Sequence, residues 1–178
     1  KKVEVKAAVL DYQGNTLSEQ THRVNISSDE TLTIGNPLTL PGDSCYYIKL
    51  TATQDGKTLS DNFYVEQSVK QGMRQLLQLP KVHLMKVVES ITPAAGNDHS
   101  ADDQTLRVTL ANDTDTPALM IRLNLKNDHG DQILPAFYSD NYFALMPHES
   151  KTVTVTWHKA DMHGSEAVIK VSGFNVTE

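Results

Sequence analysis

Apolar and polar residues alternate along most of this chain, in stretches rich in Val, Thr, Ile and Tyr. A period of two residues is typical of half-buried antiparallel strands, because successive side chains point to opposite faces of a sheet. Short strands with turn sequences between them favour an all-β fold built from sandwiches. The pattern predicts strands over residues 3–11, 22–27, 46–53, 61–67, 82–90, 105–113, 118–127, 132–137, 151–157 and 167–176.

A hairpin pattern occurs three times, with a polar turn followed by Leu on the returning strand. We expect Gly14, Gly56 and Gly130 to supply the positive φ of these turns. The string Ser-Asp-Asn, followed by two aromatic residues, also occurs twice, at 60–64 and 139–143. Asp and Asn side chains bond to nearby backbone groups, and aromatic rings anchor a segment in the core. We interpret this echo as one structural device in two related modules.

Residues 68–80 break the alternation. Val69, Met73, Leu76 and Leu77 recur at helical spacing, which predicts a short helix with an apolar stripe. The chain thus divides into three parts: 1–67, an incomplete β-sandwich; 68–79, a linker; and 80–178, a complete β-sandwich. The first part has too few strands for a sandwich, so we expect it to be truncated at its N-terminus.

Composition narrows the possible partners. The chain has 16 basic and 22 acidic residues, a net charge of −6, which argues against nucleic acid and anionic membranes. Its apolar runs are too short for a membrane-spanning helix. The single cysteine, Cys45, excludes an internal disulfide and a multi-cysteine zinc site, and its alternating surroundings predict a half-buried, unreactive thiol.

Few residues suggest catalysis or metal binding. His158, Asp161 and His163 could bind zinc if they converged, and oxygen-rich loops attract calcium, although ordinary solvated turns explain both. Asp140 and Glu149 lack the context of a glycosidase carboxylate pair. The sequence therefore predicts no catalytic residue, no metal and no cofactor. The acidic residues of the loops are Asp98, Asp102, Asp103, Asp113 and Asp115.

Aromatic residues give the one candidate binding segment. Trp157 lies in an alternating strand, which predicts a core position. Tyr138 and Tyr142 flank Asp140 and Asn141, and we expect one ring to lie inside and the other at the rim. The N-x-S/T sequons at Asn25, Asn112 and Asn175 arise easily in such a Thr-rich chain and carry little weight. The candidate site is Tyr138, Ser139, Asp140, Asn141 and Tyr142.

The second module resembles the C-terminal immunoglobulin-like domain of family 2 glycoside hydrolases, which include exo-β-D-glucosaminidases, β-mannosidases and β-galactosidase-like enzymes. It departs from the family pattern at His148, where Gly is usual. The matching positions are Asn112, Ala118, Arg122, Leu123, Leu134, Pro135, Tyr138, Ser139, Asp140, Asn141, Tyr142, Phe143, Leu145, Pro147, Glu149, Gly173, Phe174, Asn175 and Val176.

The first module resembles, more loosely, the preceding domain of the same enzymes. The matching positions are Leu10, Asp11, Gly14, Leu17, Ile48, Leu50, Asp55, Gly56, Leu59, Ser60, Asn62, Tyr64 and Leu79 to Leu84. The resemblance implies two tandem immunoglobulin-like sandwiches that follow a (β/α)8 barrel with two catalytic glutamates. That barrel is absent from this chain, and no residue here matches the family's catalytic motifs.

The resemblance implies that this chain supports the barrel, its expected partner, and that residues 138–142 lie at an interface or at the rim of the cleft. The substrate of such enzymes is an oligo- or polysaccharide with terminal β-linked glucosamine or mannose, and polysaccharide-degrading relatives suggest a periplasmic or secreted location. Two alternatives remain open: an autonomous carbohydrate-binding module, and an adhesive array with calcium in its acidic loops.

Overall fold

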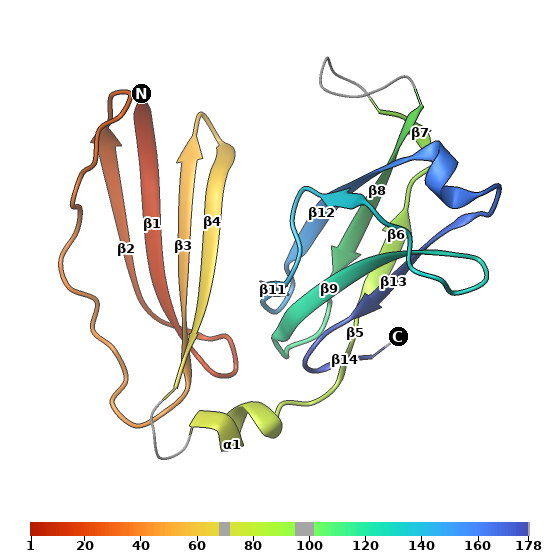
Figure 1. Cartoon of the computed structure of the whole chain (residues 1–178). Coiled ribbons are helices and arrows are strands. Elements are labelled where there is room, and N and C mark those ends of the chain that lie inside the picture. Colours follow the sequence, from red (N-terminus) through yellow and green to blue (C-terminus); the bar gives the residue numbers. More distant parts are fainter. Residues whose placement is uncertain (68–71, 95–101, 178) are drawn as a thin grey trace. The chain divides into compact units, whose positions relative to one another are not determined.

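The computed structural model describes residues 1–67, 72–94 and 102–177 (Figure 1). The chain forms two compact units, Lys1–Leu79 and Pro80–Glu178. Both consist mostly of β-strands, with one short α-helix among the described residues, and antiparallel pairing dominates, as the alternation predicted. No helix in the described part of the chain is long and apolar enough to span a membrane.

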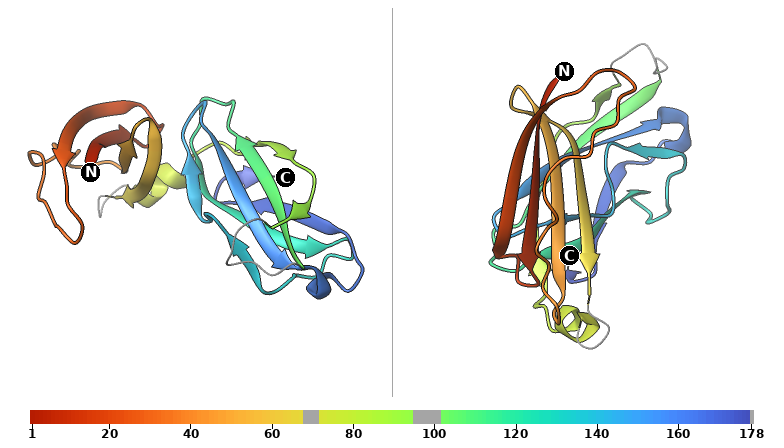
Figure 2. Two further views of the ribbon diagram at one scale, coloured as in Figure 1. Left: turned by 90° about the horizontal axis from the view of Figure 1, so that it is seen from above. Right: turned by 90° about the vertical axis from the view of Figure 1, so that its left-hand side faces the viewer.

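The described strands of the first unit form one antiparallel sheet in the order β2-β1-β3-β4. Figure 2 shows these strands side by side in one layer. Gly14 and Gly56 have φ angles of 91° and 77°, so both predicted positive-φ turns are confirmed, as is Gly130 at 93° in the second unit. The strands are β1 (Lys2–Asp11), β2 (Thr16–Asn25), β3 (Tyr46–Gln54) and β4 (Lys57–Glu66).

Helix α1 (Gly72–Leu77) bonds to the residue that precedes β3. The backbone N–H of Cys45 donates to Gln75 Oε1 at 2.7 Å, and Leu76 is buried. The predicted apolar stripe is wrong in part, because Met73 and Leu77 are 52% and 68% exposed. Because this helix has fewer than two turns, it buries one side chain rather than a continuous apolar face. Val69 lies outside the described residues.

The described residues of the second unit form two antiparallel sheets and a short parallel pair. One sheet has the order β10-β12-β8-β6, with β7 also paired to β8; the other has the order β11-β9-β13; and β14 pairs with β5. The strands are β5 (Val82–His83), β6 (Met85–Val88), β7 (Thr92–Pro93), β8 (Asp103–Ala111), β9 (Ala118–Asn127), β10 (Ala136–Tyr138), β11 (Phe143–Leu145), β12 (Ser150–His158), β13 (Ala167–Ser172) and β14 (Val176–Thr177).

The inward side chains of both sheets form one core, with Trp157 at 2% exposure, as predicted. The strand predicted over 132–137 is wrong in its first part. Gln132 makes an isolated bridge, and the strand begins only at Ala136. Pro135 has no N–H to donate, and the N–H of Ile133 donates instead to Leu125 O at 3.1 Å.

The interpretation of the repeated Ser-Asp-Asn string as one device is also wrong. Ser60, Asp61 and Asn62 lie within β4, in register with residues of β3. The second copy, 139–141, lies instead between β10 and β11. The same three residues form part of a strand in one place and a connection between two strands in the other.

Candidate functional site

Residues 139–142 connect two strands that belong to different sheets. The preceding strand, β10, pairs with β12, with Ala136 opposite Trp157 and Tyr138 opposite Val155. The following strand, β11, pairs with β9, with Phe143 opposite Ile121. The candidate segment therefore crosses from one sheet of the second unit to the other, and its polar groups must satisfy backbone atoms along the way.

Tyr138 and Ser139 fix the start of this crossing. The Leu125 N–H donates to the Tyr138 hydroxyl oxygen at 2.8 Å, and the ring packs against the core. Ser139 continues the ladder of β10: its N–H donates to Thr154 O at 2.9 Å, and its Oγ accepts from the Thr154 N–H at 2.9 Å. Both side chains therefore have structural roles, and the Tyr138 ring, which was predicted to lie inside, is partly buried against the core.

Asn141 completes the free edge of β9. Its Oδ1 accepts from the Leu123 N–H at 2.9 Å, and its Nδ2 donates to Leu123 O at 3.0 Å. The same Oδ1 accepts from the Tyr142 N–H at 3.1 Å. The amide thus replaces one residue of a neighbouring strand, because an Asn side chain carries both a donor and an acceptor.

Asp140 forms an ion pair with Lys151 of β12. The Lys151 Nζ also lies 5.0 Å from the centre of the Phe143 ring. The side chains of Asp140 and Lys151 are 35% and 23% exposed, so they lie at the margin of the core. This pair holds the middle of the crossing to β12, and it gives Asp140 a cation as its partner instead of the second carboxylate that glycoside hydrolysis would require.

Tyr142 is the exposed member of the candidate site. Its side chain is 62% exposed and its φ is 60°, a left-handed conformation. The guanidinium of Arg122 lies 5.9 Å from the centre of its ring, within the range of a cation–π contact. This is the ring that was expected at the rim.

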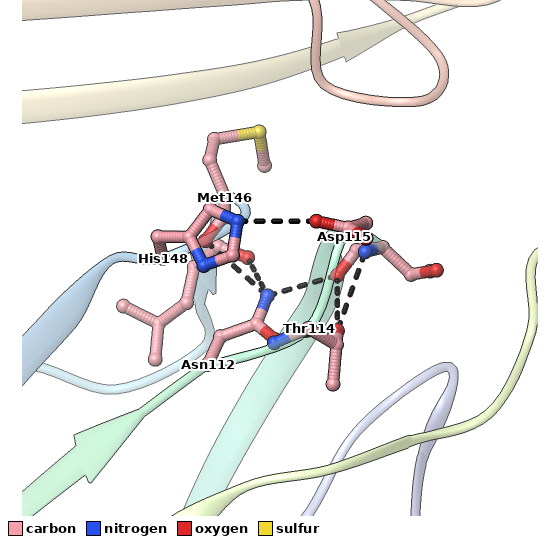
Figure 3. Close-up of polar contacts among 7 residues, drawn as sticks. Asn112, Thr114, Asp115, Met146 and His148 are labelled. Carbon is pink, nitrogen blue, oxygen red and sulfur yellow. Dashed lines mark hydrogen bonds and ion pairs between the residues drawn. The ribbon is translucent and has the colours of Figure 1, made fainter.

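A second polar cluster, which the sequence did not reveal as a cluster, surrounds Asn112 (Figure 3). Asn112 is 1% exposed, and its Nδ2 donates to the carbonyl oxygens of Thr116, Leu145 and Met146 at 2.8, 3.1 and 3.2 Å. Its Oδ1 accepts from the Thr114 hydroxyl at 2.8 Å. Every polar atom of the side chain is used to hold two loops together, and a glycan could not attach to so buried an amide.

The turn after Pro147 lies beside this cluster. His148 has a φ of 63°, so it adopts the left-handed conformation that the family's usual glycine takes without strain. Its Nε2 lies 3.1 Å from Asp115 Oδ1, and both side chains are largely exposed (Figure 3). The departure from the family pattern therefore keeps the turn and adds a surface contact.

Asn175, near the C-terminus, forms a third buried amide cluster. It is 2% exposed, accepts from the Leu119 N–H at 3.0 Å, and donates to Pro117 O and Pro80 O at 2.8 and 3.0 Å. The sequence showed these asparagines only as sequons or as family positions. Spacing along the chain does not reveal which loops meet, since partners such as Leu145, Leu119 and Pro80 lie dozens of residues away.

The remaining candidate residues are dispersed. His158 caps a short 3-10 helix, Lys159–Met162, and His163 follows it in a left-handed conformation. Within the described ranges, no group of three or more His, Cys, Asp or Glu side chains could hold a metal ion. Asp98 lies outside these ranges. Cys45 is fully buried rather than half-buried, and burial raises the pKa of its thiol, which disfavours the reactive thiolate.

Comparisons with known proteins agree with this fold. A family model described as the exo-beta-D-glucosaminidase Ig-fold domain matches residues 62–176. The exo-beta-D-glucosaminidase of Streptomyces avermitilis is 38% identical over 92 residues, which are 52% of this chain and 10% of that protein. The exo-beta-D-glucosaminidase of Hypocrea virens is 29% identical over 174 residues, which are 97% of this chain and 16% of that protein.

Solved structures show the same fold. The crystal structure of Amycolatopsis orientalis exo-chitosanase CsxA superposes with a TM-score of 0.78 at 22% identity, over 98% of this chain and 23% of that chain. A complex of the same protein with PNP-beta-D-glucosamine gives a TM-score of 0.77. This chain thus corresponds to a small part of much longer relatives, and the catalytic barrel is not in it. The chain belongs to the family of exo-β-D-glucosaminidase Ig-fold domains.

Proposed function

We propose that this chain is a non-catalytic, supporting part of an exo-β-D-glucosaminidase. In this proposal it comprises two tandem immunoglobulin-like sandwiches, the first incomplete at its N-terminus, and it buttresses a (β/α)8 catalytic barrel. The observation that carries the proposal is coverage: 98% of this chain corresponds to only 23% of the chain of an exo-chitosanase. The barrel is the natural partner of such an accessory part.

The hydrogen bonds of the candidate segment support a structural role. Tyr138, Ser139 and Asn141 bond to backbone groups of neighbouring strands, and Asp140 pairs with Lys151. A catalytic acid or nucleophile must instead face a substrate. The polar part of the motif therefore holds two sheets together, and Tyr142 is the residue that remains available to contact a partner.

The longer enzyme would remove terminal β-linked glucosamine by a retaining mechanism with two carboxylates, both supplied by the barrel. Glucosamine is favoured over mannose because the matched relatives are named exo-beta-D-glucosaminidases. The periplasmic or secreted location expected from the resemblance stays a prediction.

The test is to express the complete polypeptide that contains these residues, and to measure the release of glucosamine from chitosan oligosaccharides. The control substrate is a β-mannoside, and the control protein is this chain alone. We expect glucosamine release by the complete polypeptide only, with little cleavage of the mannoside. If the complete polypeptide cleaves neither β-glycoside, the proposal is wrong.

An autonomous carbohydrate-binding module is the second candidate, and the exposed Tyr142 ring is the observation that favours it. Its weakness is Arg122, whose positive charge beside the ring opposes a protonated glucosamine. Titration calorimetry of this chain with chitosan and mannan oligosaccharides decides the matter. Heat that disappears in Tyr142→Ala would support a binding module, and no heat with either glycan would remove it.

A further inference from the structure

Three large side chains are placed on the outward face of the sheet β11-β9-β13, two of them in contact, and we name them the Tyr142 patch: Met120, Arg122 and Tyr142. Met120 and Tyr142 are 58% and 62% exposed. Their chain neighbours Ile121 and Phe143 are buried and stand opposite each other in the ladder, so the patch residues point away from the core.

The backbone of this patch is strained. Met120 and Tyr142 have φ angles of 51° and 60°, and neither is a glycine. A bulge in the pairing of β11 with β9 lies beside them, between Phe143 and Leu145. This region of φ is unfavourable for a residue with a side chain; such strain persists only where the surrounding structure imposes it, and it clusters at functional sites. Here the strain displays two large side chains to the outside.

Hydrogen bonds through Asn141 also fix the backbone position of Tyr142. The Tyr142 N–H donates to Asn141 Oδ1, and the same oxygen accepts from Leu123. Arg122 lies over the Tyr142 ring, and among the residues that the structure describes no carboxylate pairs with its guanidinium. A preorganised aromatic ring beside a cation without a counter-ion is a surface ready for an apolar contact next to a carboxylate.

We propose that the Tyr142 patch is a docking site for another protein surface of the same longer polypeptide, one that is apolar and presents a carboxylate to Arg122. This rests on the proposed function. Tyr, Arg and Met are enriched at protein interfaces, and Tyr and Arg dominate their binding energy. This chain covers only 23% of the matched exo-chitosanase chain, so a polypeptide of that length has enough further sequence to form such a surface. Arg122 disfavours a cationic sugar as the occupant.

Methionine oxidation tests the proposal without any mutation. Met73, Met85 and Met120 are 52%, 55% and 58% exposed in this chain, whereas Met146 is 5% exposed. Dilute peroxide should therefore oxidise Met120 about as fast as Met85 in this chain alone. In the complete polypeptide we expect the oxidation of Met120 to be slower by about tenfold or more, so that its rate approaches that of Met146. The rates in denaturant give the fully exposed limit for each methionine.

Two charge-reversing substitutions on β9 test whether the partner surface presents a carboxylate to Arg122. Arg122→Glu should restore fast Met120 oxidation in the complete polypeptide, because the new charge repels the partner's carboxylate. Lys126→Glu makes the same change in charge four residues along the strand and should leave the rate within about twofold. Melting curves of both variants exclude a loss of folding as the cause.

The outcomes separate this inference from the proposed function, because oxidation is read without any substrate. If Met120 in the complete polypeptide is oxidised as fast as in this chain alone, no protein surface covers the patch and the inference fails, whatever the enzyme's activity. If Met120 is protected only when chitosan oligosaccharides are added, the patch binds sugar and the inference also fails. Protection that is lost in Arg122→Glu supports it even in a polypeptide that releases no glucosamine.

Discussion

The side-chain amide of Asn141 and the backbone of Leu123 are joined by two hydrogen bonds, of 2.9 and 3.0 Å. This pair lies where β11 has not yet begun and β9 still has an N–H and a C=O to satisfy. Tyr138 meets the same need at Leu125, with its hydroxyl 2.8 Å from the backbone nitrogen. The Ser-Asp-Asn motif of the second unit is thus explained by the crossing between its two sheets.

Replacing Asn141 with alanine should destabilise the second unit. The Leu123 N–H and C=O would lose their partner while remaining partly buried, and each such loss costs about 1–3 kcal/mol. We expect the free energy of unfolding to fall by about 2–6 kcal/mol. Urea titration followed by the fluorescence of Trp157, the single tryptophan, reports on this unit alone.

Asn62, the counterpart of Asn141 in the first copy, is the matched control. It is exposed within β4, so Asn62→Ala should change the free energy of unfolding, followed by circular dichroism, by no more than about 0.5 kcal/mol. Equal losses of stability in Asn141→Ala and Asn62→Ala would show that both Ser-Asp-Asn strings have the same role. That result would contradict their different positions in the structure.

His148 should tolerate glycine but not a β-branched residue. At a φ of 63°, glycine relieves strain while it removes the contact with Asp115, which is worth little at so exposed a site. We expect His148→Gly to lie within about 1 kcal/mol of the parent protein, and His148→Val to lose about 1–2 kcal/mol. Thermal melts of both variants check this order, and a valine variant as stable as the glycine variant would contradict it.

Gly173 should not accept even a methyl group. A Cβ built there would lie 2.9 Å from Leu119 O and 2.8 Å from Val176 Cγ2. Leu119 O cannot move away easily, because it accepts from the Phe174 N–H at 2.9 Å. We expect Gly173→Ala to cost about 2 kcal/mol in urea unfolding.

Gly42→Ala provides the comparison, since a Cβ added at Gly42 would have no heavy atom within 4 Å. This variant should be neutral, or more stable by up to about 1 kcal/mol, because alanine restricts the unfolded chain. Similar urea midpoints for Gly173→Ala and Gly42→Ala would mean that the loop at Gly173 is looser than its close contacts indicate.

The first unit should lose stability in alkaline solution. Burial raises the pKa of the Tyr47 phenol above its ordinary value of 10.0, and the charges of Cys45 and Asp11 raise it further. Burial also raises the pKa of the Cys45 thiol above 9.0. The unfolded chain therefore releases these protons at a lower pH than the folded chain. Stability is complete below these ordinary values and falls as the pH rises through and beyond them.

Circular dichroism melts between neutral pH and about pH 11 measure this loss. In Tyr47→Phe the alkaline fall should be shallower, although the variant starts about 1 kcal/mol lower because the hydroxyl no longer donates to Tyr12 O. An identical pH dependence in both proteins would exclude Tyr47 as a source of the effect.

The long strands of this fold could be predicted because their signal is local. β1, β3, β9 and β12 follow alternation within a single stretch of chain, and Trp157 was placed in the core by the same rule. β11 was missed because its three residues are too few to show a period. The limits of β10 were misplaced around Pro135 for the same reason.

The candidate site could be located from the sequence but its roles could not be assigned. Residues 138–142 stood out by motif, yet what each polar atom bonds to depends on Leu123, Leu125 and Thr154, which approach only in the folded chain. The Asn112 cluster was missed for the same reason, since Leu145 and Met146 lie more than thirty residues away in sequence. Hydrogen bonds between residues far apart in the sequence leave no periodic pattern in the sequence.

The most direct test of the central claim is to measure glucosamine release from chitosan oligosaccharides by the complete polypeptide and by this chain alone, at equal molar concentration. The account predicts release of glucosamine by the complete polypeptide and none by this chain, in keeping with a supporting role beside a catalytic barrel. Release by this chain alone would contradict the non-catalytic role. A complete polypeptide that cleaves no β-glucosaminide would contradict the assignment to an exo-β-D-glucosaminidase.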